Sequence, residues 1–324
     1  MSAGIYLLYV LLGYKPMEKT KIIFLILPHI HLLDLAGPDQ VFLEALGMGA
    51  DLTVEYCSID KPVITSSHLG IAKLKMFSRI KINKGDYVII PGAEVKFMVS
   101  KSIPFEKEIG NWLRDGYDNG AYICSVCTGA FFLARLGLLN GKKCTTHWKR
   151  TKELKERYPS INLIEDILFT EDERMFTSAG VTAGIDLALY IISRLKDENF
   201  SFKVARELVV YMRRHGGDKQ QSVFMNYRNH LHSGIHNVQD YVQQNINKKI
   251  TLSLLADIAC TSPRNLTRVF KKETGITVNY YITLIRKELL QKLANNPEIS
   301  RKQMALLCGL KSERHVIRLI QNYS

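Results

Sequence analysis

The sequence lacks the features that mark secreted, disulfide-bonded and membrane-spanning proteins. Its six cysteines, at positions 57, 124, 127, 144, 260 and 308, form no paired framework, which indicates a reducing compartment. The apolar run Ile5–Tyr14 is about half as long as a membrane span, and it has neither the basic start nor the cleavage site of a signal peptide. We therefore predict a cytoplasmic protein without membrane association, and we expect residues 1–20 to form a disordered leader.

Acidic residues are too few to balance the basic ones. The chain has 44 lysines and arginines against 31 aspartates and glutamates, a formal net charge of +13. Residues 234–324 alone hold 14 basic and 6 acidic side chains, so positive charge is densest there. Such a surface suits a polyanion such as DNA, although charge alone would also serve a membrane surface or solubility.

The stretch Ile250–Arg286 predicts two short helices joined by a tight turn. Ser262 stands where an N-cap accepts a free N–H group, Pro263 suits the first turn of the second helix, and Gly275 supplies the left-handed position that ends it. An ordinary helical hairpin with a solvated charged face would show the same pattern. If the second helix enters a major groove, its predicted DNA contacts are Ser262, Arg264, Asn265, Arg268, Lys271 and Lys272.

A second copy of the pattern favours DNA binding. Met304–Ala305 repeats Leu255–Ala256 at an offset of 49 residues, and the helix expected over Ser312–Tyr323 carries Arg314 and Arg318 as further DNA contacts. Between the copies, a continuous helix is predicted from Val278 to Ala294. It is about 25 Å long at ~1.5 Å per residue, which suits two reading helices about one DNA turn apart.

The segments LADIACTSPRNLTRVFKKETG and MALLCGLKS resemble the AraC family of bacterial transcription regulators. This resemblance implies double-stranded DNA as a partner and contact with RNA polymerase. Family members continue beyond the second recognition helix, whereas this sequence ends at Ser324. We therefore expect Val316, Leu319 and Ile320 to be half exposed, the second helix-turn-helix to be truncated, and its last helix to fray.

Before residue 215 the chain alternates apolar runs with helical patterns, as parallel strands joined by helices do. Strands are predicted over Ile22–Leu27, Tyr87–Ile90 and Tyr122–Val126. Cys127 follows the third strand at a sharp turn, and a helix is expected over Phe131–Leu136, the order of a nucleophile elbow. A helix N-terminus lowers the pKa of a thiol, so we expect Cys127 to be exposed and the most reactive of the six cysteines.

His147 and Asp34 are candidate partners of Cys127, because ligands of open parallel sheets collect at the carboxyl ends of strands. In an enzyme, these three residues would be catalytic. A cysteine at a strand end and a histidine beside a tryptophan are more often structural, so no catalysis is expected. Cys124 forms a Cys-x-x-Cys pair with Cys127, but it lies within a buried strand and no second pair exists. We predict neither a metal nor a cofactor.

The segments LLDLAGPDQVF, SVCTGAFFLARLGLLNGKKCTTHW and TSAGVTAGIDLALYII resemble the DJ-1/PfpI-like (class I glutamine amidotransferase-like) domain found in one branch of AraC regulators. The resemblance assigns the elbow cysteine to Cys127 and the nearby acidic residue to Asp34. Thr128 follows the cysteine where hydrolytic members commonly have histidine, as in the regulator branch, whose domain is thought to sense a small molecule. The resemblance to this domain implies a ligand site formed by Asp34, Cys127, Thr128 and His147.

These patterns predict an α/β protein, a DJ-1/PfpI-like parallel-sheet sandwich followed by an all-α tandem helix-turn-helix domain. The predicted boundaries are 21–214 for the ligand-sensing domain, 215–233 for a linker and 234–324 for the DNA-binding domain. We predict a homodimeric, sequence-specific transcription regulator that senses a small metabolite. The alternative is a cysteine-dependent amidase, hydratase or deglycase of the DJ-1/PfpI superfamily.

Overall fold

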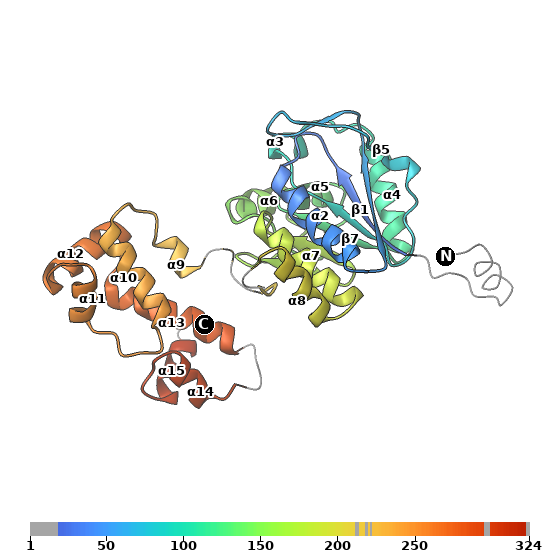
Figure 1. The fold of residues 1–324 in the computed structure, drawn as a ribbon. Coiled ribbons are helices and arrows are strands. Elements are labelled where there is room, and N and C mark those ends of the chain that lie inside the picture. Colours follow the sequence, from blue (N-terminus) through green and yellow to red (C-terminus); the bar gives the residue numbers. More distant parts are fainter. Residues whose placement is uncertain (1–18, 211–213, 218–219, 221, 295–298, 322–324) are drawn as a thin grey trace, which may run out of the picture. The chain divides into compact units, whose positions relative to one another are not determined.

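The computed structural model describes residues 19–210, 214–217, 220, 222–294 and 299–321. The chain divides into two compact units, residues 1–220 and 221–324 (Figure 1). The predicted leader lies outside the described residues except for its last two positions, and the first strand begins at Thr20. No helix among the described residues is both long and apolar enough to cross a membrane.

The first unit is built on a seven-stranded sheet in the order β10-β11-β7-β6-β1-β2-β5. All neighbouring strands are parallel except β10 and β11. The predicted strands are confirmed, two of them with the expected bounds. The strands are β1 (Thr20–Ile26), β2 (Leu52–Ser58), β5 (Lys75–Met76), β6 (Tyr87–Ile90), β7 (Tyr122–Val126), β10 (Phe169–Asp172) and β11 (Met175–Ser178).

Helices cover both faces of this sheet, which explains why its central strands are almost wholly apolar. One face packs against α2 (Leu32–Gly47), α7 (Thr182–Leu195) and α8 (Glu198–Glu207). The other packs against α3 (Val95–Met98), α4 (Glu106–Asp118), α5 (Gly129–Arg135) and α6 (Thr151–Arg157). Two small ribbons complete the unit, β3 (Val63–Ile64) with β4 (Gly70–Ile71) and β8 (Lys143–Cys144) with β9 (Asn162–Leu163).

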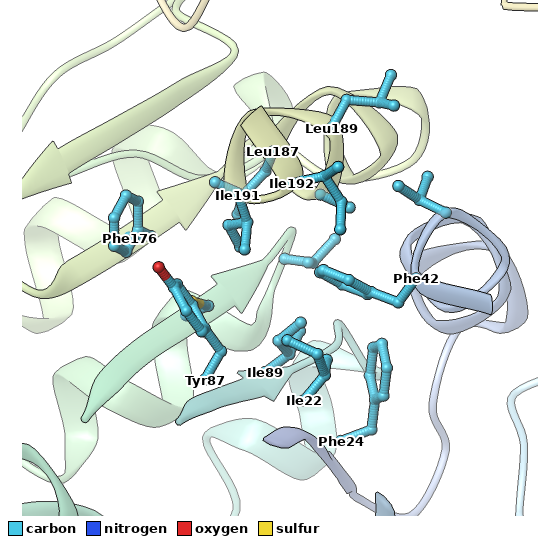
Figure 2. Packing of buried hydrophobic residues seen from close by; sticks show 14 of the residues in the cluster. Ile22, Phe24, Phe42, Tyr87, Ile89, Phe176, Leu187, Leu189, Ile191 and Ile192 are labelled. Atoms are coloured by element: carbon cyan, nitrogen blue, oxygen red, sulfur yellow. The ribbon is translucent and has the colours of Figure 1, made fainter. Parts of the chain in front are cut away.

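The side chains of β1 alternate between the two cores. Ile22 and Phe24 point toward α2 and α7, whereas Ile23 and Leu25 belong to the opposite core. Figure 2 shows Phe24 beside Phe42 of α2, and their ring centroids lie 6.2 Å apart in an edge-to-face arrangement. Burial on both faces fixes the register of β1, and therefore the place where the loop after it meets the neighbouring strand ends.

The described residues of the second unit form helices and no strands. The elements of this unit are α9 (Val223–Asn226), α10 (Ser233–Gln244), α11 (Leu252–Ile258), α12 (Pro263–Thr274), α13 (Val278–Ala294), α14 (Arg301–Leu307) and α15 (Glu313–Gln321). The longest of these helices is α13, whose predicted bounds are confirmed. Its first half packs with α10 to α12 around Phe270 and Tyr281, and its second half packs with α14 and α15 around Leu290.

The predicted linker, 215–233, contains the division between the units. Residues on both sides of this division are hydrogen bonded. The Gln220 side chain bonds within the first unit, and the backbone N–H of Val223 donates to Glu288 of α13 at 2.7 Å within the second.

The expectation that Val316 is half exposed is wrong. Val316 is fully buried among Leu290, Met304 and Cys308, because α14 and α13 cover that face of α15. Leu319 packs against the same cluster, and Ile320 is 44% exposed. The expected fraying concerned a helix running to Tyr323, whose last residues lie outside the described ones.

Acidification should destabilise the second unit through His230. Burial lowers the pKa of His230, and His236 lowers it further with a ring centroid 4.5 Å away; His232 acts in the same direction, while Gln239 and Glu273 oppose it. The folded state therefore binds this proton less readily than the unfolded chain, whose histidine pKa is about 6.5. The contribution of neutral His230 to the free energy of unfolding is fully present above that pH, and it is lost as the pH falls below it.

The measurement is thermal unfolding of the full chain at pH values from about 7.5 to 5.5. In His230→Phe, which removes this titration, we expect a smaller loss of melting temperature on acidification than in the unaltered chain. Equal losses in both proteins would show that His230 is not responsible.

Candidate ligand pocket and DNA-binding surface

Cys127 occupies a sharp turn between β7 and α5. Its φ of 57° lies in the left-handed region, which is strained for a residue with a side chain. The turn requires glycine two residues later, since a Cβ on Gly129 would lie 2.2 Å from the Ile90 carbonyl oxygen. The elbow predicted from the sequence is confirmed, and α5 begins at Gly129, two residues earlier than expected.

The expectation of an exposed Cys127 with a lowered pKa is wrong. Only 5% of its surface is exposed. Burial raises the pKa of the Cys127 thiol, and the neighbouring Asp34 carboxylate raises it further, while hydrogen bonds from Thr128 oppose the shift. The N-terminus of the seven-residue helix α5 does not outweigh these two effects.

Asp34, in the first turn of α2, is 1% exposed and lies beside the thiol. Its Oδ1 accepts a hydrogen bond from the Val181 N–H at 2.6 Å, and its Oδ2 lies 3.3 Å from His31 Nδ1. A Cβ on Gly92 would lie 2.5 Å from Asp34 Oδ2, so a glycine at 92 leaves room for the carboxylate.

His31 was not predicted, although a His-x-x-Asp spacing after the first strand could have indicated it. One ligand atom from each of His31, Asp34 and Cys127 lies within 4.8 Å of the others. Nitrogen, oxygen and sulfur donors of this kind can bind zinc. The hydrogen bonds of Asp34 to His31 and to the thiol account for the cluster without an ion, so it carries no metal assignment.

His147 lies at the same pocket but is not the hydrogen-bond partner of Cys127, whose side chain bonds to Asp34 and Thr128 instead. His147 Nδ1 accepts a long hydrogen bond of 3.4 Å from the Lys149 N–H. Burial, and then Lys149, lower the pKa of His147, so the neutral imidazole with its proton on Nε2 is favoured.

All four residues predicted for the ligand site line one pocket of about 290 Å³, close to the lower end of small-molecule sites. The acidic and thiol groups of Asp34 and Cys127 are deeply buried, whereas Lys149 and Arg150 are exposed. The complete lining is His31, Leu33, Asp34, Cys127, Thr128, His147, Lys149, Arg150 and Val181.

These exposures change the expected order of thiol reactivity. Cys260 is exposed and the other five cysteines are buried, so iodoacetamide at neutral pH should modify Cys260 first. Asp34→Asn should accelerate alkylation of Cys127, because it removes a carboxylate that raises the thiol pKa. Mass spectrometry of the peptides measures both rates, with buried Cys144 as the internal control. Alkylation of Cys127 ahead of Cys260 would contradict this order.

In the second unit, α11, a turn and α12 form the first predicted helix-turn-helix. Ser262 caps α12 by accepting a hydrogen bond from the Asn265 N–H at 3.3 Å, and Gly275 ends it with a φ of 79°. Leu266 and Phe270 are fully buried, which turns the opposite face of α12 to solvent.

That solvent face is basic. Four of the predicted DNA contacts, Arg264, Arg268, Lys271 and Lys272, are exposed and line one concave patch together with Thr267. Asn265 is different, because its Nδ2 donates to Thr261 Oγ1 at 2.8 Å and its Oδ1 accepts from Arg268 Nη2 at 2.9 Å. Both groups of this amide are therefore engaged, and Asn265 positions Arg268.

The second helix-turn-helix places its predicted contacts on the surface as well. Arg314 and Arg318 are exposed on α15. Arg314 lines a groove that also includes Lys302 and Lys311 and that is formed by α14, the turn after it and the start of α15.

Comparison with known proteins identifies both units. Residues 20–194 match the DJ-1/PfpI family, and this match covers more than half of the chain. The chain belongs to the DJ-1/PfpI family. Residues 242–283 match the bacterial regulatory helix-turn-helix proteins of the AraC family, a range that includes α11 and α12.

Among its relatives is the HTH-type transcriptional regulator ArgR of Pseudomonas aeruginosa, 28% identical over 70% of this chain and 69% of ArgR. The isonitrile hydratase of Pseudomonas putida is 31% identical over 53% of this chain and 70% of that enzyme. A THiJ/PfpI family protein from Pseudomonas syringae shares the fold, with a TM-score of 0.52 and 24% identity over 64% of this chain and 81% of that one. A DJ-1/PfpI domain followed by an AraC-type region makes this chain a DNA-binding transcription regulator.

Proposed function

We propose that the first unit binds a small-molecule effector in the pocket around Asp34 and Cys127, and that the effector changes the affinity of the second unit for its operator. The observation that carries this proposal is the buried Asp34 carboxylate at a pocket that four residues of the family motif line together. Perturbed titratable groups in a concave site are candidates for binding, and the pKa of the Cys127 thiol is raised at this pocket.

The charges at the pocket support a particular class of effector. Asp34 and the neutral form of His147 offer hydrogen-bond acceptors and donors within the site, whereas Lys149 and Arg150 line its exposed part. We therefore propose a small polar metabolite with a donor or cationic group for Asp34 and an anionic group for Lys149. Arg150 is paired with Glu153 at 3.2 Å, whereas Lys149 lies over the Trp148 ring at 5.1 Å, so we assign the anionic group to Lys149.

We further propose that the chain regulates without turning its effector over. The thiol pKa is raised, and Thr128 stands directly after the cysteine. The alternative, a cysteine-dependent hydratase or amidase, draws on the likeness to isonitrile hydratase. Cys127→Ser separates the two: a regulator keeps its effector response, whereas an enzyme loses turnover.

The remaining partners are also proposals. The resemblance to AraC regulators supports a homodimer in the cytoplasm that acts on double-stranded DNA and contacts RNA polymerase. Sedimentation of the full chain tests the dimer.

A thermal-shift screen of polar metabolites tests the effector proposal. A ligand at ~100 times its Kd should add about 2.7 kcal/mol, or roughly 5–11 °C for a unit of this size. Asp34→Asn should abolish that shift, whereas Gln40→Ala, an exposed change on the same helix α2, should leave it intact. A shift that survives Asp34→Asn would place the ligand elsewhere.

A further inference from the structure

The described residues of the segment 214–220, here called the junction segment, end the first unit immediately before the DNA-binding unit in sequence. Arg214 and Gln220 use their side chains to bind residues next in sequence to two lining residues of the pocket, Val181 and His147. The backbone of the segment is bonded to the chain at the start of β10, since the Gly216 carbonyl accepts hydrogen bonds from the N–H groups of Leu168 and Phe169 at 2.9 and 3.2 Å.

Gln220 holds the backbone on either side of the lining residue His147. Its Oε1 accepts from the Trp148 N–H at 2.8 Å, and its Nε2 donates to the Thr146 carbonyl at 2.9 Å, so it binds the peptide groups on both sides of His147. Nε2 also donates to the Ile167 carbonyl at 3.0 Å, so both donors of the amide are used. The Thr146 hydroxyl in turn donates to the Cys127 carbonyl at 2.8 Å. Gln220 is thus two hydrogen bonds from the backbone of Cys127.

Arg214 holds the start of α7, which follows the lining residue Val181. Its Nη2 donates to Thr182 Oγ1 at 2.8 Å and to Asp186 Oδ2 at 2.6 Å, and its Nε donates to the same carboxylate at 3.0 Å. Asp186 is 3% exposed, and a buried carboxylate paired in this way resists separation. The residue before Thr182 is Val181, whose N–H binds Asp34.

We propose that the junction segment reads the state of the pocket, and that Gln220 and Arg214 are its positioning residues. Gln220 bonds to the neighbour of His147, and Arg214 bonds to the neighbour of Val181. Gln220 also reaches the backbone of Cys127 through two successive hydrogen bonds. A ligand that displaces His147 or Val181 must strain or break the bonds to Gln220 or Arg214, and so alters the segment that leads to the DNA-binding unit. The inference rests on the proposed effector pocket.

The test uses a covalent probe, because the effector is not yet identified. In a full-length Cys260→Ser chain, Cys127 is the remaining cysteine that lines the pocket, whereas Cys57, Cys124, Cys144 and Cys308 lie in hydrophobic cores. Methyl methanethiosulfonate at high concentration converts the Cys127 thiol to a methyl disulfide and releases methanesulfinate, and mass spectrometry selects the preparation in which Cys127 alone is modified. The readout is the Kd for an operator selected from random duplexes by the unmodified chain. We expect modification to change this Kd at least about fivefold, the lower limit of common allosteric couplings.

With Gln220→Ala added, modification of Cys127 should change the operator Kd by less than about twofold. Gln40→Ala removes an exposed glutamine as a matched control and should retain the full change in Kd. Gln220→Glu is the second variant if alanine impairs folding: it keeps an acceptor for the Trp148 N–H but loses both donations. Hydrogen exchange of the Trp148 amide should be faster in Gln220→Ala and unchanged in Gln40→Ala.

An equal response to modification with and without Gln220 would overturn the inference, as would no response in either chain. Failure of the proposed function would appear differently, as the lack of any metabolite whose thermal shift depends on Asp34. The two outcomes are distinguishable because the covalent probe needs no effector.

Discussion

Gly180→Ala should lower the free energy of unfolding by about 3 kcal/mol or more, one of the largest effects of any single methyl group in this chain. Gly180 has a φ of 89°, and an added Cβ would lie 2.2 Å from the Cβ of Cys127 and 2.8 Å from its Sγ. The thiol cannot move away freely, because Cys127 itself occupies a strained turn and its N–H donates to the Ser178 carbonyl. Denaturant unfolding of the full chain measures the loss.

Gly49→Ala is the matched control. Gly49 has nearly the same φ, 90°, but an added Cβ there meets nothing within 4 Å. It should therefore cost only the strain of the left-handed conformation, about 1–2 kcal/mol. Similar losses in the two variants would mean that the close approach of Gly180 to Cys127 is unimportant for stability.

Arg264→Ala should raise the Kd for the selected operator about 5- to 150-fold, equivalent to about 1–3 kcal/mol, with a much smaller effect on random DNA. Arg264 is exposed near the start of α12, the part of a recognition helix that reaches base edges. Lys271→Ala, near the other end of the helix, should weaken binding to both DNAs, because a lysine there contacts phosphates.

Lys292→Ala provides the control for charge alone, since it removes an exposed lysine of α13 that is paired with Glu288. Titration of each variant against the operator and against random duplexes gives the comparison. Equal loss on both DNAs from Arg264→Ala would remove base recognition by Arg264 from the account.

Elements with strong local signals could be predicted from the sequence. The bounds of β6, β7 and α13 follow from uninterrupted apolar or helical patterns, and the turn at Cys127 follows from a strand, small residues and a helix in close succession. Asp34 and Cys127 were correctly brought to one pocket, because the carboxyl ends of neighbouring parallel strands meet at one edge of the sheet.

The features that were missed depend on contacts between distant parts of the chain. Asp34 is 147 residues from Val181, and Gln220 is 72 residues from Trp148, so no local pattern indicates either hydrogen bond. Burial of Cys127 arises from the same kind of contact, the close packing of Gly180. The prediction of a reactive thiol took into account only the helix N-terminus after Cys127. In the structure, burial and Asp34 raise the pKa of this thiol.

The most direct test of an effector-controlled regulator is the operator Kd measured with and without the metabolite found by thermal shift, in the unaltered chain and in Asp34→Asn. We expect the metabolite to change the Kd at least about fivefold in the unaltered chain. In Asp34→Asn the metabolite should have no effect on the operator Kd. An operator Kd that the bound metabolite leaves unchanged, or that it changes equally in Asp34→Asn, would contradict the account.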